Sequence, residues 1–365
     1  MKSSFGQSVN ICITGESHGE ALVAVLSGLT PGIEVDKNYI RHCLSQRAPA
    51  GEISTPRVEA DDFEILSGVF EGFTTGTPIT ILIRNTNTKS KDYSDIKNLA
   101  RPGHADYTAE AKYHGFQDYR GGGHFSGRIT AALVAAGAIA RLALKKKGIE
   151  IGTHISKCGE ICDRDFVNPT EDIKALNEKA FAVLDEESAE KMMAEILKAK
   201  ESGDSIGGIL ETAATGLPAG LGEPWFDSIE SVLAHMLFSI PGIKGVSFGA
   251  GADFAGMKGS EANGSLRMVD GKVTAVDDAS GGINGGITNG STLKFQCIVR
   301  PTPTIFKEQE TVNLSTFENA ALSAKGRHDP AIVHRVRAVA DAATALVLCD
   351  VMAQRYGTDW AMEEK

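Results

Sequence analysis

One order of elements, a strand followed by a glycine-containing turn and then a helix, occurs twice in this chain and constrains its fold more than any other feature. In the first copy, an apolar stretch at 23–26 leads through the turn 28–33 into a helical pattern over 36–47. The second copy takes the same order between residues 206 and 240. Two copies of one unit predict a fold with internal pseudo-two-fold symmetry. The copies share little identity, so a chance recurrence is the alternative.

The other apolar patterns indicate antiparallel sheets around buried helices. Segments 63–85 and 244–257 each contain short strands joined by glycine turns, the pattern of β-hairpins. The alanine-rich 129–147 is apolar nearly all round, which predicts a central helix, and 338–355 is a second helix of this type. We expect an α+β layered sandwich with largely antiparallel sheets, and a single domain over 1–365 because no linker interrupts the chain.

Charge and cysteine content exclude several classes of protein. The chain carries 37 Lys and Arg against 47 Asp and Glu, a formal net charge of −10, which disfavours nucleic-acid and anionic-membrane partners. Half of this excess lies in 171–204, and the periodicity and charges of 171–200 predict a solvated outer helix. No stretch has the character of a signal peptide or a membrane span, so we expect a cytoplasmic protein. The six cysteines are scattered, which predicts reduced, mostly buried thiols and no metal site.

A histidine stands between small residues directly after the apolar stretch 9–13. The sequence there is Gly15-Glu16-Ser17-His18-Gly19. An imidazole at a strand end can donate or accept a proton near neutral pH. A turn with an ordinary surface histidine is the alternative, and the five residues do not match the nucleophile elbow of a hydrolase.

A second group of motifs combines histidine, arginine and glycine. His104 lies in the stretch 101–106, and the run of glycines 121–123 stands between Arg120 and His124. Glycines before a helix N-terminus expose backbone N–H groups where the helix dipole favours anions, which predicts a phosphate cradle. The pattern is neither the dinucleotide fingerprint nor a P-loop, and a glycine turn without a ligand is the alternative.

The third group lies in the second half of the chain. Residues 300–304 carry an arginine, and Asp329 precedes a proline that holds its backbone extended beside Arg327 and His328. Single arginines such as Arg41, Arg47 and Arg57 suit carboxylate or phosphate, although each alone is typical of an ordinary surface residue. Together the three groups describe a site for a small, multiply anionic ligand. From the residues alone, a lyase, a phosphatase and an isomerase all remain open.

Longer motifs stand in the order found in one known family. They are Gly15-Glu16-Ser17-His18-Gly19 and the stretches 67–72, 74–79, 101–106, 119–123, 220–224, 281–287 and 326–330. With these motifs the sequence resembles the chorismate synthase family over nearly its whole length. The resemblance implies conversion of 5-enolpyruvylshikimate 3-phosphate to chorismate and phosphate with reduced FMN. It further implies a β-α-β sandwich with internal pseudo-symmetry, assembled as a homotetramer, with a phosphorylated carboxylate as the substrate.

The resemblance also implies roles for individual residues. His18 would protonate the departing phosphate, His104 would hold a proton against the reduced flavin, and Asp329 would assist deprotonation. Ser17 and Ser126 would lie in the proton-relay or substrate shell. The remaining assignments are flavin contacts at Arg47, His124, Phe125, Ser126, Gly285, Arg300, Pro301, Thr302, Pro303, Thr304 and Arg327, and substrate contacts at Arg41, Arg47, Arg128 and Arg337.

Three departures from the family pattern bear on the cofactors. Many members continue the glycine run with Arg-Ser-Ser-Ala-Arg, whereas this chain has His124-Phe125-Ser126-Gly127-Arg128. Glu52 or a neighbour stands where the family has a second arginine after Arg47, which puts an NADPH contact in doubt. Pro241 and Gly242 replace an Asn-Ala pair. NADPH therefore stays open as the reductant of the flavin.

Overall fold

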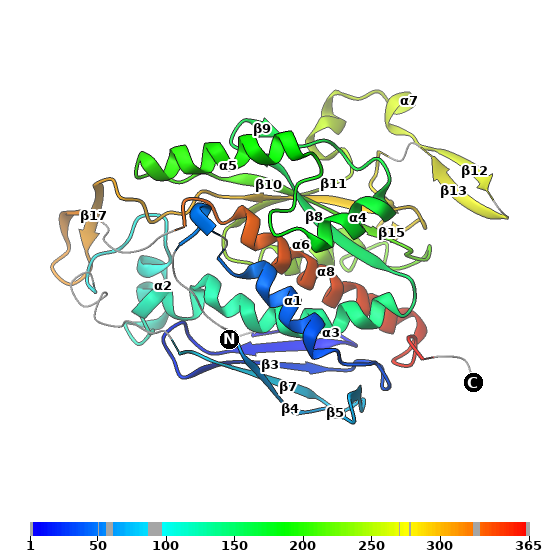
Figure 1. Cartoon of the computed structure of the whole chain (residues 1–365), viewed down its shortest axis with the longest axis horizontal. Helices are drawn as coiled ribbons and strands as arrows, with labels where there is room; N and C mark the ends of the chain where they lie inside the picture. Colours follow the sequence, from blue (N-terminus) through cyan, green and yellow to red (C-terminus); the bar gives the residue numbers. More distant parts are fainter. Residues whose placement is uncertain are drawn as a thin grey trace.

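Two five-stranded antiparallel sheets enclose a layer of helices in the computed structural model (Figure 1). The structure describes residues 3–49, 51–55, 61–86, 97–269, 271–276, 279–323 and 329–362. The first sheet has the spatial order β1 (Ser4–Phe5), β2 (Asn10–Thr14), β3 (Ala21–Ser27), β7 (Ile79–Arg84), β4 (Phe63–Ser67). The second has the order β9 (Ile161–Cys162), β8 (Glu150–Cys158), β10 (Gly208–Thr215), β16 (Leu293–Val299), β11 (Ile243–Phe248).

The two sheets are copies of one topology. Without the short edge strands β1 and β9, the first sheet reads β2-β3-β7-β4 and the second β8-β10-β16-β11. In both sheets, the first two of these four strands along the chain lie side by side. The fourth strand along the chain lies between the second and the third. The predicted α+β sandwich with an internal two-fold repeat and largely antiparallel sheets is therefore confirmed.

Each half of the chain contributes two helices to the layer between the sheets. After β3 comes α1 (Lys37–Arg47), and after β10 comes α6 (Ile229–Leu237). Each half closes with a long helix, α3 (Thr130–Lys145) or α8 (Val333–Tyr356). The two predicted central helices are thus present, and Figure 1 shows α1, α3 and α8 between the sheets.

The helices α3 and α8 cross at very close range. A Cβ atom on Gly137 of α3 would stand 2.4 Å from the Cβ of Ala342 on α8, so only glycine fits at this crossing. The helical stretch Gly127–Lys145 is apolar and long enough to cross a membrane by composition, but 89% of its most apolar window is buried inside the protein. Its apolarity is that of a core helix, because both neighbouring helices and a sheet cover it.

Two predictions for the middle of the chain are wrong. The expected outer helix over 171–200 is a pair, α4 (Pro169–Glu178) and α5 (Glu186–Glu201), and each buries an apolar stripe that includes Leu176 or Ile196. The expected hairpin over 244–257 is absent, since β11 pairs with the distant β16 and is followed by a 3-10 turn, η5 (Gly251–Gly256). The hairpin expected in the first half is present, because β4 pairs with β7.

Shorter elements complete the described part of the chain. They are η1 (Gly51–Ile53), β5 (Val69–Phe70), β6 (Phe73–Thr74), α2 (Asp106–Tyr113), η3 (Arg120–Phe125), η4 (Gly127–Ile129), α7 (Gly259–Ala262), β12 (Ser265–Val269), β13 (Lys272–Val276), β14 (Ile283–Asn284), β15 (Ile287–Thr288), β17 (Gln309–Asn313) and β18 (Glu318–Leu322). All six cysteines are free and four of them are buried, as predicted. Within the described residues, no group of His, Cys, Asp and Glu could hold a metal ion.

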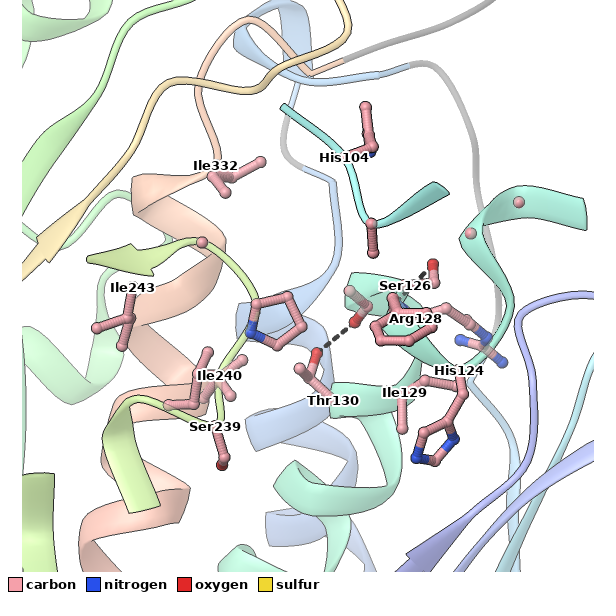
Figure 2. A pocket seen from close by; sticks show the side chains of 18 of the residues that line it. His104, His124, Ser126, Arg128, Ile129, Thr130, Ser239, Ile240, Ile243 and Ile332 are labelled. Atoms are coloured by element: carbon pink, nitrogen blue, oxygen red, sulfur yellow. Dashed lines mark hydrogen bonds between the residues drawn. The ribbon is translucent and has the colours of Figure 1, made fainter. Parts of the chain in front are cut away.

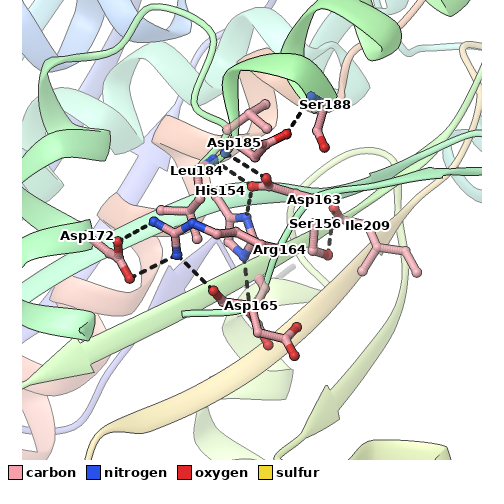
Figure 3. A network of polar contacts seen from close by, with 12 residues as sticks. His154, Ser156, Asp163, Arg164, Asp165, Asp172, Leu184, Asp185, Ser188 and Ile209 are labelled. Carbon is pink, nitrogen blue, oxygen red and sulfur yellow. Dashed lines mark hydrogen bonds and ion pairs between the residues drawn. The ribbon is translucent and has the colours of Figure 1, made fainter. Parts of the chain in front are cut away.

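A buried histidine joins the second sheet to the helices outside it (Figure 3). The Nδ1 of His154 on β8 lies 2.6 Å from Asp163, and its Nε2 lies 3.0 Å from Glu211 on β10. Asp163 also accepts hydrogen bonds from the amides of Leu184 and Asp185, which fixes the connection between α4 and α5. Burial by itself would lower the pKa of His154, but the two carboxylates outweigh it and raise the pKa.

Candidate active site

A cavity of about 1180 Å³ opens where α3 and α8 begin, and both halves of the fold line it. Its walls include the C-terminal end of α1, the loop before α2, the glycine loop η3 and the segment after α6. Ligand pockets for one drug-sized molecule usually measure about 300–1,000 Å³. The volume is therefore large enough for more than one small molecule.

One part of the cavity wall is charged and another is apolar. Among the described residues, the cations on the wall are Lys97, Lys244, Arg47, Arg101, Arg128, Arg300 and Arg335, and the acids are Asp61, Asp106, Asp118, Asp329 and Glu110. Cations exceed acids here although the whole chain is acidic. The apolar part includes Ile129, Ile240, Ile243 and Ile332, which Figure 2 shows around the same space as His104, His124 and Arg128.

The loop that carries His18 is packed against the glycine loop. The amide of Ser17 donates to the carbonyl of Gly123 at 3.0 Å, and the Nδ1 of His124 lies 2.8 Å from the carbonyl of Gly15. Since a carbonyl only accepts, Nδ1 of His124 carries the proton. Both Ser17 and His18 are buried. The sequence motifs around residues 18 and 121 therefore form one unit of structure.

Gly121 lies directly against the His18 imidazole. Its φ is +60°, a conformation that costs a non-glycine residue strain energy. A Cβ atom at Gly121 would lie 2.2 Å from Cε1 and 2.3 Å from Nδ1 of His18. Gly121 itself lines the cavity. Only the missing side chain lets the backbone lie this close to the ring.

The glycine run differs from the predicted cradle in its relation to the helix. Gly121, Gly122 and Gly123 all have positive φ, so η3 is a sharp non-helical bend. The turn η4 follows, where the Ser126 hydroxyl accepts from the amide of Arg128 at 3.3 Å, and α3 begins only at Thr130. The glycines thus serve the close contact with the His18 loop and do not form the first turn of α3.

His104 is held by the second half of the chain. Its Nε2 lies 2.5 Å from the hydroxyl of Thr304, and Arg300 donates to the carbonyl of Gly103 at 2.8 Å. Arg101 binds Asp106 through two nitrogens, each at 2.7 Å. Burial would raise the pKa of Asp106, but the hydrogen bonds from Arg101 outweigh it and lower the pKa. The loops 101–106 and 300–304, far apart in sequence, therefore form one wall.

A buried carboxylate joins two arginines of the cavity. Asp61 accepts from Arg47 at 2.5 Å through one oxygen and from Arg128 through the other. All three side chains are more than nine-tenths buried. Burial would raise the pKa of Asp61, but the two guanidinium groups outweigh it and lower the pKa, while burial lowers the pKa of Arg47.

Asp329 precedes α8 by four residues and lies on the cavity wall. It accepts from the amide of Thr55 at 2.8 Å and from Arg335 at 2.5 Å. The same Arg335 donates to the carbonyl of Arg47 at 2.9 Å. Asp329 is therefore connected through Arg335 to the C-terminal end of α1.

Most of the expected site residues come together at this cavity, but some lie elsewhere. Those on its wall are Arg47, His104, His124, Phe125, Ser126, Arg128, Arg300, Pro303 and Asp329, while Ser17 and His18 lie next to Gly121 of the wall and Thr304 binds His104. Arg41, Gly285, Pro301 and Thr302 are not on the wall. Arg327 lies outside the described residues.

Arg337 is a correction to the expected substrate contacts. Its side chain is fully buried on α8, donates to the carbonyls of Leu176 and Lys179, and lies 3.8 Å from Asp341. A guanidinium enclosed in this way contacts no ligand in the cavity. It holds the α4 end against α8, because those carbonyls end α4.

Three polar residues of the site were missed by sequence reasoning, namely Asp61, Asn85 and Arg335. Asp61 looks like one of two adjacent acids before a strand, and Arg335 like one of several helix cations. Nothing in their spacing marks them, because partners such as Arg47, which binds both Asp61 and Arg335, are 14 and 288 residues away. Asn85, which follows a predicted strand, carries the only available signal, a polar residue at a strand end.

The cavity and its proton-carrying groups define an enzyme that acts on a small molecule. A family model for chorismate synthase matches residues 9–353. The chorismate synthase of Methanosarcina mazei is 46% identical over 349 residues, 95% of each chain, and that of Aeropyrum pernix is 43% identical over 97% of this chain and 93% of its own. A crystal structure of chorismate synthase superimposes with a TM-score of 0.76 at 28% identity, over 97% of this chain and 94% of the other. The chain belongs to the chorismate synthase family, whose members are lyases.

Proposed function

We propose that this protein converts 5-enolpyruvylshikimate 3-phosphate to chorismate and phosphate in the shikimate pathway. The observation that supports it most is that His104 and Asp329, from distant parts of the chain, line one arginine-rich cavity, with the His18 ring against Gly121 of the same wall. The reaction is a 1,4-elimination, in which a ring C–H bond and the C–O bond to phosphate both break. It needs an acid for the leaving phosphate and a group that accepts the ring hydrogen.

The arginines of the cavity suit the charges of this substrate. Arg128 and Arg47 stand side by side on Asp61, and Arg101 and Arg300 lie on the wall with His104. Guanidinium groups bind carboxylate and phosphate oxygens through paired N–H donors. In this proposal they hold the anionic substrate, and partial neutralisation by Asp61 keeps two buried cations together without mutual repulsion.

His18 supplies the proton for the departing phosphate in this proposal. Its ring lies against Gly121, a residue of the cavity wall. Because glycine has no side chain, the imidazole can lie this close to the wall. Ser17, the buried neighbour of His18 in the chain, would pass the proton on in this proposal.

Reduced FMN is the cofactor in this proposal. The cavity exceeds the volume that one small ligand fills, and it combines cations with the apolar wall of Ile129, Ile240, Ile243 and Ile332. These side chains would bind the apolar part of the flavin, and Arg300, His104 and Thr304 would bind its polar atoms. When bound, the reduced flavin supplies transient electron density that lets the phosphate leave in a reaction without net oxidation. Asp329 and His104 would hold protons at the edge of that ring.

The function is tested by anaerobic incubation of the protein with the substrate and dithionite-reduced FMN. Chorismate and phosphate are expected in equal amounts, and none with oxidised FMN. Phosphate without chorismate, or phosphate release that ignores the flavin, would instead indicate a phosphatase. Flavin binding without any product would indicate a binding module. An aerobic assay with NADPH and oxidised FMN decides whether the chain reduces its own flavin.

We further propose that the chain is cytoplasmic and acts as a homotetramer. The β12–β13 hairpin extends away from the sandwich (Figure 1), and Leu266, Met268 and Val273 on one of its faces are each more than 60% exposed. An apolar face of this kind is typical of a contact between subunits. Light scattering after gel filtration should give four chain masses, and Met268→Glu should lower that mass.

A further inference from the structure

Asn85 stands where the first sheet meets the loop that carries His18. It follows β7 directly, and its amide donates to the carbonyl of Glu20 at 3.0 Å. Its side-chain Nδ2 donates to two further carbonyls of the same loop, Glu16 at 3.0 Å and Gly19 at 2.9 Å. Three hydrogen bonds from one residue thus close the loop between β2 and β3.

The other end of the same side chain holds an arginine of the cavity. The Oδ1 of Asn85 accepts from the Nε of Arg128 at 3.0 Å. The orientation of the amide is fixed by chemistry, since a guanidinium only donates and backbone carbonyls only accept. Arg128 is also bound to Asp61, so its guanidinium is held from two sides. A single amide therefore links the His18 loop to a cation on the cavity wall.

The pseudo-symmetry of the fold supports a role for this position. β7 and β16 are equivalent strands of the two sheets, and the residues that follow them are Asn85 and Arg300. Arg300 donates to the carbonyl of Gly103, in the loop that carries His104. In each sheet, the side chain of the residue after this strand thus donates a hydrogen bond to a backbone carbonyl of a loop that carries a histidine.

We infer that Asn85 is a positioning residue, which ties the loop of His18 to the Arg128 guanidinium so that the proton-carrying ring and the anion-binding cation keep a fixed relation. The inference rests on the proposed function. A small displacement of a reacting group costs much in rate, about 100-fold for 1 Å. Removing the amide should therefore lower kcat by more than the accompanying loss of stability explains.

The matched control is Asn177 on α4. Its Oδ1 accepts from Arg141 at 3.1 Å and its Nδ2 donates to the carbonyl of Ile151 at 3.2 Å, so it likewise links a guanidinium to a backbone carbonyl, but it does not line the cavity. Asn85→Ala and Asn177→Ala should lose similar stability in urea. Asn85→Ala should lower kcat about 10–100-fold, whereas Asn177→Ala should keep kcat within about twofold.

A double-mutant cycle asks whether Asn85 acts through His18. If it does, Asn85→Ala lowers kcat in the wild-type background and has little effect in His18→Ala, because the ring it positions is gone. Equal factors in both backgrounds, or equal losses for Asn85→Ala and Asn177→Ala, would overturn the inference. In that case Asn85 is a structural residue like Asn177.

Hydrogen exchange tests the same inference without turnover. The amides of Ser17 and Gly19 are bonded to the carbonyls of Gly123 and Glu16. In Asn85→Asp, which keeps the acceptor for Arg128 but lacks the two donors, these amides should exchange at least about tenfold faster. Unchanged exchange would overturn the inference even in an active enzyme. If the wild type forms no chorismate, the proposed function fails, but the exchange result still decides the role of Asn85 in holding the loop.

Discussion

The contact between Gly121 and His18 allows a prediction that separates two effects of an alanine substitution, backbone strain and a steric clash with the His18 ring. Gly121 and Gly122 are neighbours in one loop, with φ values of +60° and +82°. An alanine at either position pays for a left-handed backbone, about 1–2 kcal/mol. The two positions differ in what the new methyl group meets.

At Gly122 a Cβ atom would meet nothing closer than 3.8 Å, whereas at Gly121 it would lie 2.2 Å from the His18 ring. Ordinary van der Waals contact begins at 3.4 Å, so the ring or the loop has to move by at least about 1.2 Å. A displacement of about 1 Å at a reacting group costs about 100-fold in rate. Gly121→Ala should therefore lower kcat about 100-fold relative to Gly122→Ala under conditions in which both variants are folded.

The assay is chorismate formation under anaerobic conditions with reduced FMN, beside urea unfolding of both variants. The effect of Gly121→Ala should also disappear in a His18→Ala background, since the ring that the new methyl group displaces is absent there. Equal kcat values for the two alanine variants would refute the argument. They would show that the His18 ring is not positioned by this contact, or does not take part in the rate-limiting step.

The remaining predictions concern the folded state. Asp61→Ala should lower the unfolding free energy by about 3–5 kcal/mol in urea, because it leaves two buried guanidinium groups without a counter-charge; Asp118→Ala, whose partner Arg120 is 39% exposed, should cost less than about 1 kcal/mol. His154 has a raised folded pKa, so its imidazolium stabilises fully below the ordinary value of about 6.5 and less as pH rises through the folded value. His154→Gln should remove that loss from thermal midpoints measured between pH 5 and 9, and curves that stay parallel would contradict the assignment. Gly137→Ala should destabilise by about 1–3 kcal/mol despite the better helix propensity of alanine, since its Cβ meets Ala342 at 2.4 Å; a higher melting temperature would show that α3 and α8 can separate.

Local pattern was sufficient for the elements that dominate the fold. The alanine-rich apolar stretch gave α3, and Asp36 caps α1 by accepting from the amides of Asn38 and Tyr39. Periodicity failed where the information was not local. The hairpin predicted after residue 244 was wrong because β11 takes its partner from β16, some fifty residues later, across an inserted hairpin. The charges of 171–200 predict one solvated helix, because the apolar positions that its two helices bury are few among many charged ones.

The sequence by itself determined which residue types could do chemistry here, because histidine, arginine and glycine stand in short motifs whose local geometry they control. It also determined the repeat, since each copy forms its own strand, turn and helix. Only the tertiary structure decided which of these residues meet. Asp61 gains its role from arginines on two different helical segments, Asn85 from a loop and a cation 43 residues away, and Arg337 loses its expected role because α8 places it in the interior. Such pairings depend on packing between distant segments, and a one-dimensional pattern does not contain the distances that decide them.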